Sequence, residues 1–283
     1  SVPTRTYYDL EGITFGNNKF VAVGKSGVVR TSSDNGTSWD NGTSGTTRTL
    51  WEIAYGNSTF VAVGDSGTHL YSRDNGGTWS AGTWSENDRV TGVAFGNNTF
   101  IGVSIYGEYV TKSVDNGSNW SKKAQGIAVY DVTYGNSKFV ASGDNGAIAH
   151  SSNDGENWTN GESRTSTAYL YGITFGNNRF LTVGASGWLS YSSDNGSDFT
   201  ALTIPLANTL YSTAYGNNIF VSVGYYSVVV SDNDMSEDPI LKANSYYFND
   251  VTFGNGVFVA VGNDENIYTS TDGDTWTKVY GKP

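Results

Sequence analysis

Short apolar and aromatic runs alternate with Gly- and Asn-containing turns along the whole chain. Residues 50–79 show the pattern once: LWEIAY and FVAVG flank GNST, and THLYS and TW follow the turns DSG and DNGG. Short runs rich in β-branched and aromatic residues are typical of strands, and Gly and Asn suit the tight turns between them. The pattern therefore predicts a four-stranded antiparallel meander.

This unit recurs seven times. Four strands per copy and no helical period indicate an all-β fold, and units too small to bury a face alone must pack on one another. We expect a closed seven-bladed β-propeller of about 40-residue blades, because radial closure leaves only short, protected strand edges. The copies fill almost all 283 residues, which predicts a single domain over residues 1–283. A Gly-Asn pair after an aromatic residue marks each copy, at spacings of 38 to 41 residues: Gly16, Gly56, Gly96, Gly135, Gly176, Gly216 and Gly254.

Composition narrows the function classes. The net charge is −11, with 16 Lys and Arg against 27 Asp and Glu, which argues against a nucleic-acid partner because phosphate binding needs a basic surface. No apolar run is long enough to insert into a membrane. The chain has no Cys, which excludes disulfides and thiolate metal sites. A polar composition with few Lys is typical of exported proteins, so we expect a secreted or cell-surface protein.

A second motif precedes each fourth strand. SSDNGTSW at 32–39, SRDNGGTW at 72–79 and SVDNGSNW at 113–120 fit the pattern S-x-D-x-G-x-x-W. This pattern resembles the Asp-box of BNR-type repeats, a family of β-propellers. The resemblance implies a structural turn, in which the Asp accepts backbone N–H groups and the aromatic residue packs between strands. The sixth copy, SDNDMSED, lacks the Gly and Trp, so we expect blade six to have the most irregular outer edge.

The Asp-Asn-Gly turns are also candidate sites for a bound calcium ion. Asp34-Asn35-Gly36 is similar to part of a calcium loop, but the chain lacks the bidentate Glu that closes such a loop. We therefore expect no cofactor, with Ca²⁺ binding possible only in an unspecific way.

The meander topology separates two faces of the disc. The Gly-Asn turns and the S-x-D-x-G-x-x-W turns fall on one face and are alike in most copies. The other connections fall on the opposite face and differ between copies, and variable loops on a rigid scaffold are where binding sites are usually found. We call this second face the loop face. Ring closure should come from packing of the first blade on the last, helped by residues 1–6.

The candidate site lies where the inner strands begin, at the loop-face mouth of the central channel. Two adjacent positions in each copy should ring this mouth, and they carry aromatic residues and carboxylates in several copies. The neighbouring loops add further aromatic residues, among them Tyr8, Trp84, Tyr106, Tyr225 and Tyr226. The candidate ligand-binding residues are Glu11, Trp51, Glu52, Tyr130, Asp131, Tyr171, Tyr211 and Asp250.

Three functions are consistent with these residues. Aromatic rings beside carboxylates suit a sugar, so the first hypothesis is a lectin-like or adhesin-like protein that binds a glycan or polysaccharide without chemistry. The second is a glycoside hydrolase or lyase that uses carboxylates and tyrosines at the channel mouth. The third is a protein-assembly scaffold, because the chain resembles the photosystem II assembly factor family in blade number and in its VG..G......DG..W rhythm. That resemblance implies an Arg-rich patch, for which this chain offers Arg5, Arg48, Arg89 and Arg164.

Overall fold

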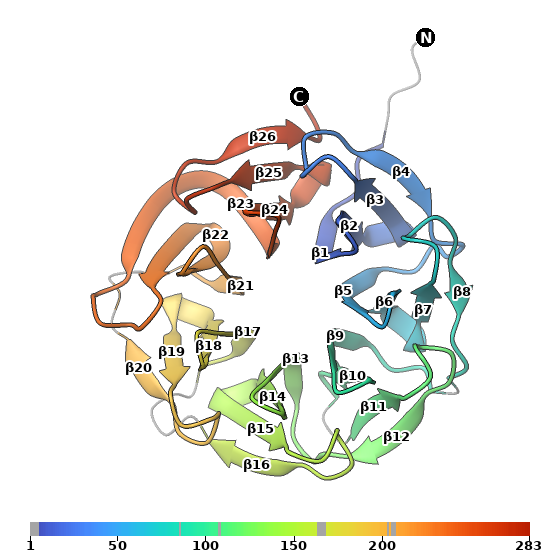
Figure 1. Cartoon of the computed structure of the whole chain (residues 1–283), viewed down its shortest axis with the longest axis horizontal. Coiled ribbons are helices and arrows are strands. Elements are labelled where there is room, and N and C mark those ends of the chain that lie inside the picture. Colours follow the sequence, from blue (N-terminus) through green and yellow to red (C-terminus); the bar gives the residue numbers. More distant parts are fainter. Residues whose placement is uncertain (1–5, 85, 107–108, 163–167, 203, 205–207) are drawn as a thin grey trace.

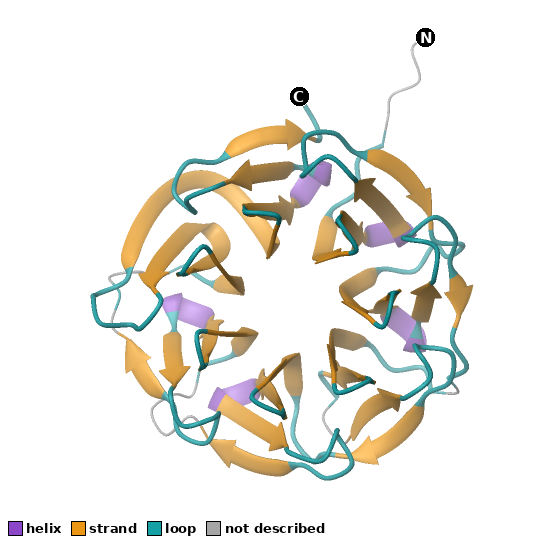
Figure 2. Ribbon diagram, viewed as in Figure 1, coloured by secondary structure: helices purple, strands orange, loops and turns teal. Residues whose placement is uncertain are grey.

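The protein is an all-β propeller whose sheets surround a central axis (Figures 1 and 2). The computed structural model describes residues 6–84, 86–106, 109–162, 168–202, 204 and 208–283. Its sheets are antiparallel, five with four strands and one with six. The first strand of each blade lies nearest the axis and the fourth lies on the rim (Figure 1). The predicted meander is therefore confirmed.

The strands follow the repeats in order. The first three blades contain β1 (Leu10–Gly16), β2 (Lys19–Gly24), β3 (Val28–Ser32), β4 (Asp40–Thr43), β5 (Leu50–Gly56), β6 (Thr59–Gly64), β7 (His69–Ser72), β8 (Ser80–Ala81), β9 (Val90–Gly96), β10 (Thr99–Ser104), β11 (Tyr109–Ser113) and β12 (Ser121–Ala124). The fourth and fifth contain β13 (Val129–Gly135), β14 (Lys138–Gly143), β15 (Ala147–Ser151), β16 (Thr159–Glu162), β17 (Leu170–Gly176), β18 (Arg179–Gly184), β19 (Leu189–Ser192) and β20 (Thr200–Leu202).

The last two blades share the six-stranded sheet. It contains β21 (Leu210–Gly216), β22 (Ile219–Asp232), β23 (Ile240–Gly254), β24 (Val257–Gly262), β25 (Ile267–Ser270) and β26 (Thr277–Tyr280). Short 3₁₀ turns join the second and third strands of blades one, two, four, five and seven: η1 (Lys25–Gly27), η2 (Asp65–Gly67), η3 (Asp144–Gly146), η4 (Ala185–Gly187) and η5 (Asn263–Glu265).

Blade six departs from its expected form. Its second and third strands are the two halves of β22, and β23 forms both its outer strand and the inner strand of blade seven. The outer strand pairs in regular register from Ser227↔Ala243 to Val230↔Ile240. The register of the same strand pair shifts between Tyr225↔Tyr247 and Ser227↔Ala243, so the expectation of the most irregular outer edge stays a prediction. In the turn, the position of the missing Gly is occupied by Met235. It adopts a positive φ of 55° and is buried in the core.

The ring closes by packing of blade one on blade seven. Each inner strand contacts the next around the axis, and β1 contacts both β5 and β23. Both blades are built from continuous sequence, as predicted. Two hydrogen bonds join Tyr8 and Glu265 at this seam: the Glu265 N–H donates to the Tyr8 carbonyl at 3.0 Å, and the Tyr8 N–H donates to Glu265 Oε1 at 3.3 Å. Residues 1–5, which we expected to help, lie outside the described residues.

The Gly-Asn marker has a packing role. The Gly16 position is pressed against the ring of the next blade, so that an added Cβ would lie 2.0 Å from Tyr55 Cγ. The same contact closes the ring, where a Cβ on Gly254 would lie 2.1 Å from Phe15 Cγ. No side chain fits at either position. The marker therefore recurs because each blade seats its first-strand aromatic residue on the glycine of the blade before it.

The S-x-D-x-G-x-x-W turns are closed by their own side chains. In the first copy, Ser38 N donates to Asp34 Oδ1 at 2.9 Å, and Gly36 N donates to Ser32 Oγ at 2.9 Å. The buried Trp39 ring donates from Nε1 to the Gly36 carbonyl at 2.9 Å. The turn therefore has the hydrogen bonds that the sequence pattern implied.

Contacts between blades establish which turns share a face. The Asn17 side chain, in the Gly-Asn turn of blade one, donates to Asn75 Oδ1 in the fourth-strand turn of blade two at 2.7 Å. Asn255, in blade seven, makes the equivalent contact to Asn35 at 3.0 Å. The two repetitive turns therefore lie together on one face, as predicted, and the variable connections form the loop face.

Candidate functional site

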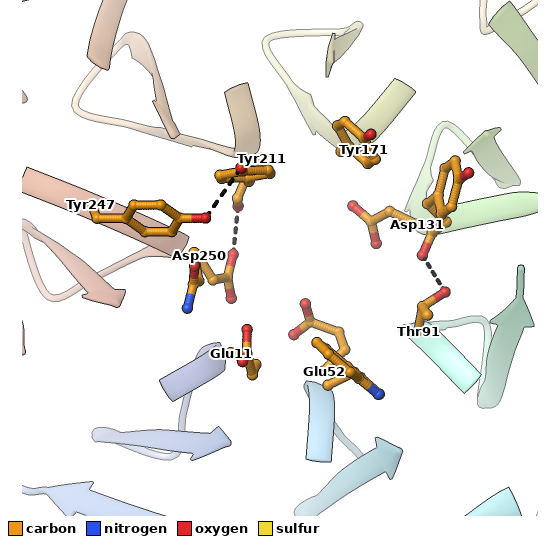
Figure 3. Close-up of a pocket in the computed structure, with 12 residues that line it drawn as sticks. Glu11, Glu52, Thr91, Asp131, Tyr171, Tyr211, Tyr247 and Asp250 are labelled. Atoms are coloured by element: carbon orange, nitrogen blue, oxygen red, sulfur yellow. Dashed lines mark hydrogen bonds between the residues drawn. The ribbon is translucent and has the colours of Figure 1, made fainter. Parts of the chain in front are cut away.

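A cavity of about 300 Å³ opens at the mouth of the central channel. Its walls come from the first strands of all seven blades, and Figure 3 shows carboxylates and rings directed toward one open centre. The structure brings all eight candidate residues together here, although ligand binding by them stays a prediction. The lining residues are Glu11, Trp51, Glu52, Thr91, Tyr130, Asp131, Tyr171, Tyr211, Ser212, Tyr247, Asn249 and Asp250.

A bulge at the start of each inner strand explains why two adjacent positions reach the cavity. In β1 the pairing runs from Leu10↔Gly24 to Gly12↔Val23, so that Glu11 is an extra residue without a partner on β2. The same shift occurs in the other six inner strands. A bulge re-aims side chains next to the extra residue. Both positions therefore contribute to the channel mouth.

The buried carboxylates bridge neighbouring blades. Asp131 accepts the N–H of Val132 in its own blade at 2.7 Å and that of Ile173 in the next blade at 2.9 Å. Asp250 likewise accepts the N–H of Val251 at 2.8 Å and that of Ile13 across the closing seam at 2.7 Å. Each bridge satisfies two backbone donors. These two carboxylates therefore help to hold the inner ring together.

Glycine alternates with these acidic residues for lack of space. A Cβ on Gly92 would lie 2.8 Å from Asp131 Cα, and a Cβ on Gly12 would lie 2.8 Å from Glu52 Cα. Because there are seven blades, glycine and larger residues cannot alternate all the way around the ring. In one pair of neighbouring blades, both residues at this position carry side chains. That pair is Ser212 and Asp250, and the Ser212 hydroxyl donates to Asp250 Oδ1.

The acidic residues at the channel mouth have raised pKa values. Burial raises the pKa of Asp131 to about 7 and the pKa of Asp250 to about 6, against the opposing effect of their backbone hydrogen bonds. Burial, together with the nearby charges of Asp250 and Asp131, raises the pKa of Glu52 well above its ordinary range. Burial also raises the pKa of Glu11, although the Lys25 ammonium acts against it. The site therefore holds carboxyl groups that take up protons near neutral pH.

Two residues of the aromatic rim, Trp51 and Tyr130, already use their polar atoms in hydrogen bonds. Trp51 Nε1 donates to Asp65 Oδ1 at 2.8 Å, and the Arg89 guanidinium lies 4.8 Å from the centre of the Trp51 ring. The Tyr130 hydroxyl donates to Asp144 Oδ1 at 2.6 Å. These rings are therefore held in fixed positions by the loops that follow the second strands.

Seven tyrosines form a continuous band that extends from the cavity over the loops of blades four to seven. Neighbouring ring centres lie 4.5 to 6.4 Å apart. Its outer members Tyr169, Tyr225 and Tyr226 are 44%, 43% and 46% exposed. We call this band the tyrosine arc: Tyr130, Tyr169, Tyr171, Tyr211, Tyr247, Tyr225 and Tyr226.

Sequence reasoning missed two members of the arc. Tyr169 and Tyr247 occupy equivalent positions in copies five and seven, one residue before the first residue that pairs with the second strand, which is Leu170 or Phe248. Aligning the copies at this position would have shown the two aromatic residues. Tyr247 belongs to the cavity itself, where its hydroxyl lies 3.2 Å from the Tyr211 hydroxyl (Figure 3).

Some loop residues named from the sequence are not at the cavity. Trp84 packs toward the rim, where its ring centre lies 5.6 Å from His69. Tyr106 is 62% exposed and does not line the cavity. Arg48 donates to the Ser66 carbonyl at 2.5 Å. The remaining arginines of the expected patch, Arg5 and Arg164, lie outside the described residues.

Neither a metal-binding cluster nor a membrane-spanning helix occurs among the described residues. Within these ranges, no group of three or more His, Asp and Glu side chains is arranged to hold a metal ion. In the same part of the chain, no helix is both long and apolar enough to cross a membrane.

Similar solved structures share the architecture. "YCF48 from Cyanidioschyzon merolae" matches with a TM-score of 0.75 and 16% identity, over 95% of this chain and 97% of that one. The chain has a β-propeller fold. The WD40 propeller domain of Doa1 matches with a TM-score of 0.73 and 12% identity, over 94% and 93% of the two chains. "YCF48 bound to D1 peptide" matches with a TM-score of 0.64 and 19% identity, over 82% and 81%. No protein-family model and no curated protein matches the chain.

The predicted glycan or polysaccharide partner is contradicted by this last neighbour, whose ligand is a peptide. The site gives a physical reason for the correction. A sugar needs an open ring face and free polar groups, but Arg89 lies over Trp51 and the Tyr130 hydroxyl is already bonded to Asp144. The residue types were those of a sugar site, but their arrangement is different.

Proposed function

We propose that this protein is a binding scaffold whose loop face takes up a segment of another protein. The tyrosine arc is the observation that carries the proposal. Tyrosine is enriched at the energetic centres of protein interfaces, because its ring buries a large apolar area while its hydroxyl can still form a hydrogen bond. An arc that crosses four blades is longer than a compact ligand needs, and it suits an extended chain.

The rigidity of the face supports the same function. The cavity residues stand on inner strands whose ring is closed by backbone hydrogen bonds to Asp131 and Asp250. A preformed surface loses little conformational entropy on binding, so more of its contact energy appears as affinity. The partner then has to adapt to the propeller.

A likeness at the level of the fold adds to the argument. One similar propeller, YCF48, is described as bound to a peptide, the D1 peptide. We carry over from it only the class of partner, a protein segment. The S-x-D-x-G-x-x-W turns lie on the opposite face, and we infer that they are Asp-boxes with a structural role.

Selection of peptides provides the test. A phage-displayed random dodecapeptide library is panned against the immobilised protein, and the affinities of enriched peptides are measured. Tyr171→Ala and Tyr211→Ala should each weaken binding about tenfold or more, as for an interface residue worth over 1 kcal/mol. Tyr106→Ala is the matched control, since Tyr106 lies outside the arc and the cavity. Failure to enrich any peptide, or equal losses in all three variants, would argue against the proposal.

A further inference from the structure

We propose that the cavity at the channel mouth receives a lysine or arginine side chain of the bound protein. This inference rests on the proposed function, and it adds the chemical identity of one partner residue. The cavity has aromatic walls and an acidic floor, and it opens among the tyrosines of the arc (Figure 3). A cationic side chain can interact with the aromatic walls and with the acidic floor at the same time.

The acidic floor lacks a matching positive charge. Lys25 is 3.6 Å from Glu11, and it is engaged more closely by Asp9 at 2.5 Å. Across the described part of the chain, the ion pairs include none with Glu52, Asp131 or Asp250. Asp250 is only 7% exposed, and buried carboxylates are usually paired with a cation.

Glu52 is the carboxylate best placed for a ligand. Its Oε1 atom accepts the Ile53 N–H at 2.7 Å, and Figure 3 shows the carboxylate directed at the open centre. Asp131 and Asp250 are different, because each uses both oxygens to accept backbone N–H groups. The cation would therefore bond most directly to Glu52 and be attracted by the others from a greater distance.

The aromatic walls favour a cation over a neutral or anionic group. The negative faces of Tyr and Trp rings attract an ammonium or guanidinium group, whereas the carboxylates would repel an anion. The volume of about 300 Å³ is at the lower end of the range for ligand pockets, which suits one side chain entering from the surface. The rings that form these walls are Tyr130, Tyr171, Tyr211 and Tyr247, together with the face of Trp51 that Arg89 does not cover.

Binding of a cation should be coupled to release of protons. Burial raises the pKa of Asp131 to about 7 and that of Asp250 to about 6, and it raises the pKa of Glu52 well above its ordinary range. A cation favours the ionised forms of these groups. Affinity should therefore rise between pH 6 and pH 8. The other titratable groups at the mouth are Glu11, Tyr130, Tyr171, Tyr211 and Tyr247. The charged groups around them are Lys25 beside Glu11, Arg89 and Asp65 against Trp51, and Asp144 at the Tyr130 hydroxyl.

The test uses small probes that need no known partner. Isothermal titration of the full chain at low salt compares Nα-acetyl-lysine methylamide with Nα-acetyl-norleucine methylamide, which lacks the ammonium group. The lysine probe should bind about tenfold more tightly, as expected for one charge-assisted hydrogen bond, and its affinity should increase from pH 6 to pH 8. Equal affinities of the two probes for the wild-type protein would overturn the inference without any variant.

A variant then assigns the charge. Glu52→Gln should weaken the lysine probe about tenfold, and Asp40→Asn, an exposed carboxylate on the outer strand β4, should leave its affinity unchanged. Melting curves establish that both variants fold. An unchanged affinity in a folded Glu52→Gln variant would contradict the assignment of the cation to this cavity.

The peptide selection separates this inference from the proposed function. Peptides that bind through Tyr171 and Tyr211 but are equally tight without Lys or Arg would overturn the inference and leave the proposed function standing. If no peptide binds through the arc while the lysine probe still binds, the proposed function falls, and with it the assignment of the cation to a protein side chain.

Discussion

The Arg30 guanidinium lies 2.7 Å from Glu265 Oε2, and this buried ion pair joins blade one to blade seven. Arg30 Nε donates to the same oxygen at 3.1 Å. Arg30 stands in β3 and Glu265 ends η5, so the pair crosses the seam where the two ends of the chain meet. Ring closure therefore depends on a charged contact as well as on core packing.

Removing one partner of this pair should destabilise the protein strongly. Arg30→Met removes this buried cation from the Glu265 carboxylate, and breaking a buried ion pair typically costs about 3–5 kcal/mol. The double variant Arg30→Met/Glu265→Leu should recover much of this loss, because neither charge then remains. Urea unfolding of the three proteins measures the effect. A double variant no more stable than the single one would show that the seam needs the charges for another reason.

The alternation of glycine and acidic residues around the inner ring predicts a second substitution that lowers the stability of the protein. Gly172→Ala would place a Cβ 2.7 Å from the Tyr211 carbonyl oxygen and 3.0 Å from Ser212 Cα, both backbone atoms that cannot move aside. Overpacking of this kind costs about 1–3 kcal/mol. Gly77→Ala is the matched control, since Thr37 occupies the same position in the first copy. Thermal unfolding should show a lower midpoint for Gly172→Ala alone, and equal midpoints would contradict the packing argument.

The fold could be predicted because its determinants are local. Each Gly-Asn marker reports a steric need that recurs at every blade interface, as Gly16 against Tyr55 shows. Blade six could not be predicted in the same way. Its turn relies on Met235 filling core space, which depends on side chains from the preceding blade such as Leu181 and Leu189.

The buried carboxylates should make stability depend on pH. The pKa of Asp131 is raised to about 7 in the folded protein, so its contribution to the free energy of unfolding is complete below about pH 4 and is lost as pH rises through 7. Asp131→Asn removes this titration. Urea unfolding between pH 4 and pH 8 should therefore give a flatter profile for the variant, and an identical slope in both proteins would contradict the assigned direction.

The exposed carboxylates of the fourth-strand turns should change the free energy of unfolding with pH in the opposite direction. Hydrogen bonds from Ser38 lower the pKa of Asp34 to about 2, and those from Thr78 do the same for Asp74. Their contribution is present above about pH 4 and is lost as pH falls toward 2. Acid unfolding below pH 4 should therefore begin at a higher pH in Asp34→Asn than in the wild type. An unchanged onset would count against a stabilising role of the ionised turn.

Two tryptophans allow a matched test of the fourth-strand turn. Trp39 Nε1 donates to the Gly36 carbonyl, whereas Trp79 Nε1 is buried and has no hydrogen-bond partner among the described residues. Trp39→Phe should therefore cost about 1 kcal/mol more in unfolding free energy than Trp79→Phe. Phe199 already occupies this position in copy five, so both variants should fold. A larger loss in Trp79→Phe would contradict the role given to the hydrogen bond.

Most residues of the cavity could be predicted, although Tyr247 was missed, and the contacts that set its chemistry could not. The repeat register alone placed Glu52, Asp131 and Asp250 at the channel mouth, because every copy brings the same position to the axis. The hydrogen bonds of Asp131 and Asp250 to the next blade could not be seen in the sequence, since they depend on a bulge and on the distance between blades. The position of Arg89 over the Trp51 ring, where it covers one face, could not be predicted from the sequence either.

Hydrogen–deuterium exchange with and without a selected peptide tests the central claim most directly, because it shows where the peptide binds without altering the protein. We expect the peptide to slow exchange in residues 168–171 and 224–227, which carry the arc on the loop face. The turns at 33–38 and 73–78 on the opposite face should exchange at unchanged rates. Protection of these turns, with none in the arc, would contradict the proposal that the loop face binds proteins.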